Sequence, residues 1–152
     1  MQKEPILVSA CLLGIPCRYD GKSVPSEAVR ALADRFRLIP VCPEVLGGLP
    51  VPREPMEIQS GRVIGRSGAD GTAAYREGAQ KALALAKRYG CRAALLKERS
   101  PSCGKGSIHN GNFDGGLIPG NGVAAALLLE NGIAVFGENE IEKLLAYSEK
   151  KA

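Results

Sequence analysis

The sequence has no tryptophan, and aromatic residues make up only 5% of its 152 positions. Proteins that bind single-stranded nucleic acid usually stack the bases on aromatic side chains, so this class is disfavoured. No apolar run approaches the roughly 20 residues that span a bilayer. The first ten residues also lack the basic region and long apolar core of a secretory signal. We therefore expect a cytoplasmic protein that does not enter a membrane.

Histidine is almost as scarce. His109 is the only one, which excludes a three-histidine zinc site and limits any Ser-His or Cys-His catalytic pair to that residue. The chain also contains no C-x-x-C motif, which is typical of structural zinc sites and dithiol redox sites. An odd number of cysteines without an export signal disfavours structural disulfides, so metal binding or catalysis better explains clustered thiols. The five cysteines are Cys11, Cys17, Cys42, Cys91 and Cys103.

The sequence does contain alternating strand-like and helix-like segments. Short apolar runs at 5–10, 37–42, 91–97 and 133–136 are typical of strands buried on both faces. Segments with helical periodicity lie between them, at 26–36, 72–89, 123–130 and from 139 onward. This order predicts a single α/β domain over residues 1–152. Its sheet should be open, mostly parallel and of about four strands, with helices on both faces (Rossmann-like) and a small hairpin at 56–65.

Two loop regions have ambiguous patterns. The glycine-rich segment 98–122 predicts a long loop without regular structure, and a loop of this kind in a small domain is usually functional. Within it, His109 is interpreted as a polar turn residue and Asn121 as the cap of the following helix. The segment 70–72 begins a helix and could bind a phosphate, which would make the protein a nucleotide-binding module. Ordinary capping by Asp70 or Thr72 is the simpler interpretation of that pattern.

Three cysteines follow predicted strands. Cys11 comes directly after the first strand, Cys42 ends the second, and Cys103 lies in the loop after the third. Because parallel strands end at one edge of a sheet, we expect these thiols to meet there. Soft thiolates without histidine suit an iron–sulfur cluster, and three ligands for four irons would leave one iron open as a Lewis acid. Unrelated buried thiols are the alternative.

The remaining candidates surround these thiols. Cys91 begins its strand at the opposite edge, and we interpret it as a small buried hydrophobic residue. Cys17 lies on the same edge as the three thiols and is a fourth ligand, a reactive thiol or a bystander. Glu44 is either a solvated loop carboxylate or a general acid/base beside the metal. Ser102 could orient a substrate or water.

The cysteine motifs together resemble the domain-of-unknown-function family 523, which contains the thiouracil desulfidases (TudS-type enzymes). The segments that carry the resemblance are SACLLG (9–14), RYDG (18–21), PVCPE (40–44) and SPSCG (100–104). The similarity runs over essentially the whole chain. No motif is specific alone, but the three cysteine motifs in this order are.

The resemblance implies a [4Fe–4S] cluster held by Cys11, Cys42 and Cys103. It implies that the fourth iron takes the sulfur of a thiolated pyrimidine, either thiouracil or a thiouridine nucleotide. Water would then replace that sulfur in a non-redox hydrolysis that releases sulfide. Glu44 corresponds to the family's acidic catalytic position, and Ser102 is the neighbouring polar candidate.

Some relatives carry an additional C-terminal domain and act on thiouridine in transfer RNA. This sequence ends at Ala152 without one, and its net charge is only +4. We therefore expect a free base or nucleotide as substrate rather than transfer RNA. The alternative function is a non-catalytic iron–sulfur or zinc protein that acts as a sulfur carrier or sensor.

Overall fold

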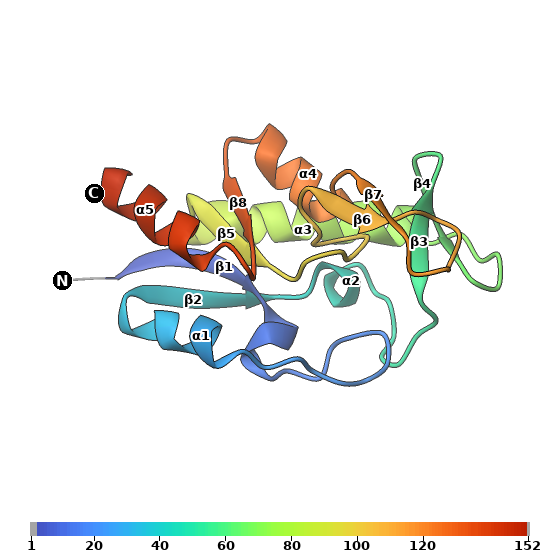
Figure 1. The fold of residues 1–152 in the computed structure, drawn as a ribbon, viewed down its shortest axis with the longest axis horizontal. Coiled ribbons are helices and arrows are strands. Elements are labelled where there is room, and N and C mark those ends of the chain that lie inside the picture. The colour runs from blue at the N-terminus through green and yellow to red at the C-terminus, as the bar shows by residue number, and fades with distance from the viewer. Residues whose placement is uncertain (1–2, 152) are drawn as a thin grey trace.

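A four-stranded parallel sheet forms the centre of the computed structural model, which describes residues 3–151 (Figure 1). The strand order is β2–β1–β5–β8, and every pairing is parallel. The predicted α/β fold is therefore confirmed, with a main sheet that is parallel throughout. Pro40 lies in the edge strand β2, as expected for a residue without a backbone N–H. The strands are β1 (Glu4–Ser9), β2 (Phe36–Val41), β5 (Ala93–Leu96) and β8 (Ala134–Gly137).

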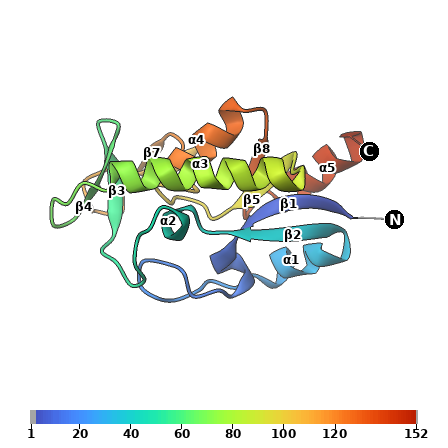
Figure 2. The ribbon, with the colours of Figure 1, turned by 180° about the vertical axis from the view of Figure 1, so that it is seen from behind.

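Helices cover both faces of this sheet. Seen from behind, α3 runs across one face together with α4 (Figure 2), while α1 and α5 pack on the other. Leu7 packs in the core on the α3 and α4 face of the sheet. Ile6 and Val8 pack in the core on the α1 and α5 face, because side chains alternate along a strand. No helix among residues 3–151 is long and apolar enough to cross a membrane. The helices are α1 (Glu27–Arg30), α2 (Pro43–Leu46), α3 (Thr72–Tyr89), α4 (Val123–Glu130) and α5 (Ile141–Lys151).

The starts of α1 and α4 test two predicted helix caps. Ser26 caps α1 as predicted, because its Oγ accepts the N–H of Val29 at 3.2 Å. This helix is shorter than its periodicity indicated: it continues as a 3-10 turn, and Phe36 lies in β2. The prediction that Asn121 caps α4 is wrong. Its side-chain oxygen instead accepts the N–H of Gly106 at 2.8 Å.

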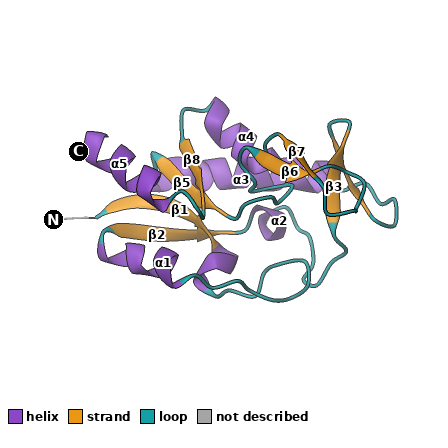
Figure 3. Ribbon diagram, in the orientation of Figure 1, coloured by secondary structure: helices purple, strands orange, loops and turns teal. Residues whose placement is uncertain are grey.

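Two small antiparallel hairpins lie beside one another, away from the main sheet (Figure 3). The predicted hairpin at 56–65 is confirmed as β3 (Met56–Gln59) and β4 (Arg62–Gly65). The prediction that 98–122 lacks regular structure is wrong, because it contains β6 (Ser107–His109) and β7 (Leu117–Pro119). Strands of three residues are too short to produce a recognisable alternation.

Helices α2 and α3 touch through two glycines. A Cβ atom at Gly78 would lie 1.9 Å from the carbonyl oxygen of Pro43, and one at Gly47 would lie 2.0 Å from that of Ala74. Real Cβ atoms do not approach an oxygen this closely, so both positions require glycine. This contact fixes the short helix that follows Cys42.

Gly78→Ala is expected to destabilise the protein by about 1–3 kcal/mol, the usual cost of overpacking a tight contact. Alanine favours a helix over glycine by only about 1 kcal/mol, and here the clash with α2 should outweigh that gain. Chemical denaturation would measure the change. Gln80→Ala, at an exposed position of the same helix, is the control and should shift stability by less than about 0.5 kcal/mol. An increase in stability for Gly78→Ala would contradict the α2–α3 contact.

Candidate functional site

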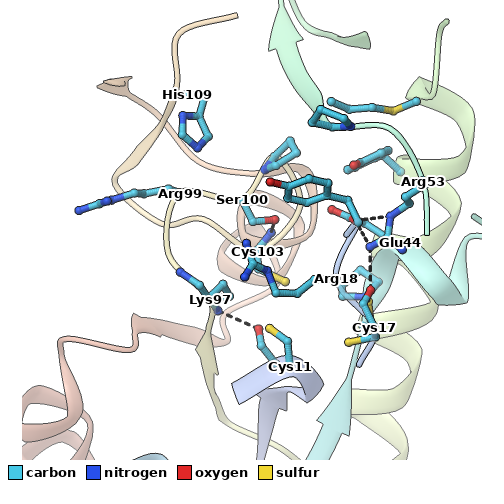
Figure 4. A pocket seen from close by; sticks show the side chains of 18 of the residues that line it. Cys11, Cys17, Arg18, Glu44, Arg53, Lys97, Arg99, Ser100, Cys103 and His109 are labelled. Carbon is cyan, nitrogen blue, oxygen red and sulfur yellow. Dashed lines mark hydrogen bonds and ion pairs between the residues drawn. The ribbon is translucent and has the colours of Figure 1, made fainter. Parts of the chain in front are cut away.

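The carboxyl ends of β1, β2 and β5 open into a cavity of about 440 Å³ (Figure 4). The structure brings the three predicted thiols together there with a fourth: Cys11, Cys17, Cys42 and Cys103 all line the cavity. Cys91 does not line it; it is buried just before β5, at the other end of that strand.

Local backbone structure positions each predicted ligand at a strand end. Cys11 lies in the 3-10 turn Ala10–Leu13, which directly follows β1. Cys42 is the N-cap residue of α2 and precedes Pro43, a residue well suited to the first turn of a helix. The turn that carries Cys103 is closed by Ser100, whose Oγ accepts the N–H groups of Ser102 and Cys103 at 3.0 Å each.

The thiols interact with one another. Cys17 is only 7% exposed, and a hydrogen bond with the Cys11 thiol raises its pKa. A hydrogen bond with Cys17 is the main cause that raises the pKa of Cys42, and burial raises it further. Burial raises the pKa of Cys103 to about 12. Metal ligation requires thiolates, so a metal centre bound by Cys42 and Cys103 would release protons.

A buried ion pair lies beside the thiols. The Nε of Arg53 donates to the carboxylate of Glu44 at 2.8 Å, its Nη2 donates to the same oxygen, and the two side chains are only 6% and 13% exposed. Arg53 also donates to the carbonyl of Cys17 at 2.9 Å. The guanidinium fixes the orientation of the Glu44 carboxylate at the edge of the cavity. Tyr75 of α3 completes this wall, and burial, with the charge of Glu44, raises the pKa of its hydroxyl.

Ser102 does not lie where a substrate-orienting residue should. It is 1% exposed and absent from the cavity lining, whereas Ser100 lines it. Its carbonyl accepts the N–H of Ala124 at 2.9 Å, and this contact directs the turn toward α4. Its hydroxyl is buried with no hydrogen-bond partner among the residues that the structure describes. Although Ser102 is adjacent to Cys103 in the sequence, only Cys103 lines the cavity.

Basic side chains form much of the remaining lining. Arg18, Arg66, Lys97 and Arg99 contribute to it. Lys97 pairs with Glu138 at 2.8 Å. His109 also lines the cavity from β6, and its Nδ1 is buried without a partner within residues 3–151. Its interpretation as a turn residue is therefore wrong. The three arginines were missed because single basic residues in loops carry no sequence signal for a shared site.

The donor set fits a cluster better than a single ion. Among residues 3–151, no three His, Cys, Asp or Glu side chains are placed to hold one metal ion. Tetrahedral thiolates on one zinc bring their sulfurs to about 4 Å from one another, whereas a four-iron cubane needs about 6–7 Å. Four thiols that line one cavity suit the larger centre.

The start of α3 does not offer an open phosphate site. Asp70 accepts the N–H of Thr72 at 2.9 Å, and Arg62 pairs with Asp70 at 2.7 Å. The hydroxyl of Thr72 accepts the N–H of Val63 at 2.9 Å. A hydrogen bond from Thr72 lowers the pKa of Asp70 to about 2. The observed contacts correspond to ordinary capping, the simpler of the two interpretations.

The fold and cavity define a class: an α/β protein with a thiol-lined, basic cavity at the carboxyl edge of its sheet. The sequence model of the 2-thiouracil desulfurase family matches residues 6–140, and the chain belongs to this family. The resemblance seen in the cysteine motifs is thereby confirmed.

Two relatives are similar over nearly their whole length. The uncharacterized protein YbbK of Bacillus subtilis (strain 168) is 48% identical over 150 residues, covering 92% of this chain and 99% of its own. A solved structure described as the [4Fe-4S]-dependent thiouracil desulfidase TudS is 50% identical, with a TM-score of 0.90. That match covers 96% of this chain and 99% of the TudS chain.

Proposed function

We propose that this protein is a [4Fe–4S]-dependent desulfidase that removes sulfur from thiolated pyrimidines by non-redox hydrolysis. The observation that carries the proposal is the gathering of Cys11, Cys42 and Cys103 around one cavity. These three thiolates would hold the cluster. When bound, the cluster would supply a Lewis-acidic iron that accepts sulfur. The similarity to TudS supports this assignment.

Glu44 is the proposed general base. Its carboxylate faces the cavity and would accept a proton from the water that attacks the thiocarbonyl carbon. Arg53 is a positioning residue, because it holds the carboxylate and the Cys17 carbonyl at the same time. We assign Ser102 no contact with substrate. Its buried hydroxyl is instead available as a donor to the cluster that the adjacent Cys103 would hold.

The basic lining favours an anionic substrate, so we propose a thiouridine nucleotide in preference to a free base or transfer RNA. Neither Arg66 nor Arg99 has a carboxylate partner within 4.0 Å among residues 3–151. A cavity of about 440 Å³ falls in the size range of small-molecule sites. Unpaired guanidinium groups at such a site are ready partners for a phosphate.

Arg99→Gln is expected to lower kcat/KM for thiouridine monophosphate by about 10-fold or more, because a hydrogen bond to a charged group contributes about 1.5–3 kcal/mol. The value for free thiouracil should stay within about twofold. Steady-state kinetics of the reconstituted protein would measure both. Arg76→Gln, an exposed arginine of α3 outside the cavity, is the matched control. An equal loss for base and nucleotide would contradict a phosphate-binding role.

Anaerobic reconstitution with iron and sulfide tests the function directly. The protein should bind four irons and four sulfides and release sulfide from thiouracil or thiouridine monophosphate without an added reductant. In water enriched in oxygen-18, the heavy isotope should appear in the oxo-pyrimidine. A requirement for reductant would contradict the non-redox mechanism. A loaded cluster without any release, or one zinc in place of iron, would favour the sulfur carrier or sensor.

A further inference from the structure

Phe113 has a backbone conformation that is unfavourable for its residue type. Its φ is +55°, in the left-handed region that phenylalanine rarely adopts. Such conformations persist only where neighbouring contacts enforce them, and they concentrate at functional sites. Phe113 is half-buried and lines the cavity described above.

Glu57 of β3 enforces this conformation. Its carboxylate accepts the N–H of Gly111 at 2.9 Å and the N–H of Phe113 at 3.2 Å. Glu57 is only 8% exposed, and its hydrogen bond with Gly111 is buried. Gln59 of the same strand donates to the carbonyl of Gly111 at 2.6 Å. The first hairpin thus holds the 110–113 turn in place over the cavity.

The other two phenylalanines of the chain serve the core. Phe36 of β2 is 2% exposed and packs in the core on the α1 face of the sheet. Phe136 packs against Tyr147 with ring centroids 5.8 Å apart. Phe113 instead lines the cavity, and the guanidinium carbon of Arg66 lies 5.4 Å from its ring centroid. One cation covers at most one face of a ring, and Phe113 lines the cavity in which a planar ligand would bind.

We propose that Phe113 is a specificity-determining residue that stacks on the pyrimidine ring of the substrate. The inference rests on the proposed function for the identity of the base, but stacking itself requires no cluster. Any base can stack on an aromatic side chain, and stacking of one base is strong enough to change the binding affinity about 10-fold. Arg66, on the same ring, would add a cation beside the nucleotide.

Kinetics of the reconstituted protein provide the first test. Phe113→Leu should raise KM for thiouridine monophosphate about 10-fold and leave kcat within about twofold, because stacking contributes equally to ground state and transition state. Phe113→Tyr keeps the ring and should restore the normal KM. Unchanged KM in Phe113→Leu, or a loss confined to kcat, would overturn the proposal.

A stability measurement separates stacking from packing. Phe113→Gly should unfold at the same or a higher denaturant concentration, because glycine adopts positive φ without strain. Its KM should nevertheless rise as in Phe113→Leu. A large loss of stability in Phe113→Gly would mean that the ring is a core residue. Glu57→Gln keeps an acceptor for both N–H groups and should raise KM less than Phe113→Leu.

Fluorescence provides a test that is independent of catalysis. Because the chain has no tryptophan, Phe113→Trp creates a single reporter at the cavity. In the cluster-free full-length protein, uridine monophosphate should quench its emission, whereas ribose 5-phosphate, which lacks the base, should not. Leu117→Trp, at an exposed position of β7, is the control and should respond to neither.

The fluorescence test separates the failure of stacking from the failure of the proposed function. Quenching by uridine monophosphate in a protein that releases no sulfide once reconstituted would support stacking and reject the desulfidase. Normal sulfide release, with neither quenching nor a change in KM, would reject stacking alone.

Discussion

Cys42→Ala is expected to abolish cluster assembly and sulfide release together. Cys42 begins α2 and lines the cavity with the other candidate ligands. Loss of residues that only support metal ligands already costs about 10- to 100-fold in metal affinity or activity. Removal of a ligand should therefore lower activity by more than about 100-fold. Iron and sulfide analysis, with the visible absorption of the reconstituted protein, would measure assembly directly.

Cys91→Ala is the matched control for this experiment. It removes the same sulfur atom from a buried position, but one that lies outside the cavity. Iron content and sulfide release should equal those of the unmodified protein. Full activity in Cys42→Ala would reject the three-thiol centre. Equal losses in both variants would point to a general effect on folding.

Glu44→Gln is expected to lower kcat by about 100- to 10,000-fold, the usual contribution of a positioned acid or base. The amide preserves the shape of the side chain but cannot accept a proton from water. The cluster should still assemble, because the thiols are unchanged. Rapid-mix or steady-state measurement of sulfide release at saturating substrate would determine kcat.

Stability must be followed alongside kcat in this variant, because Glu44 is the buried partner of Arg53. An uncompensated buried charge is strongly destabilising. Chemical denaturation would separate that loss from the catalytic effect. Glu77→Gln, an exposed carboxylate on α3, should change neither kcat nor stability. A kcat within about twofold of normal for Glu44→Gln would show that another group activates the water.

The prediction of the fold succeeded where the pattern was local. Apolar runs ended within one or two residues of the observed strands, and the β3–β4 hairpin was located by the turn at Ser60–Gly61, where both residues have positive φ. It failed for β6 and β7, whose three residues each contain less than two full alternations. The same limit explains His109, which was interpreted as a turn residue but lies in β6.

The candidate site was predictable in part. The rule that parallel strands end at one edge placed Cys11, Cys42 and Cys103 in one region, and the structure has all three around one cavity. Ser102 was selected for its position beside a thiol in the sequence, but it is buried and does not line the cavity. Neighbours in a tight turn point in different directions, so adjacency in sequence is a poor guide to a shared site.

The sequence by itself determined the family, the parallel sheet and the edge at which the thiols gather. Each of these depends on short motifs or on a periodicity that spans only a few residues. Only the tertiary structure decided that Arg53 pairs with Glu44, that basic residues surround the thiols, and that Glu57 holds Phe113 over the cavity. These contacts join segments from separate loops and strands. Their geometry depends on how the elements pack, which no local pattern encodes.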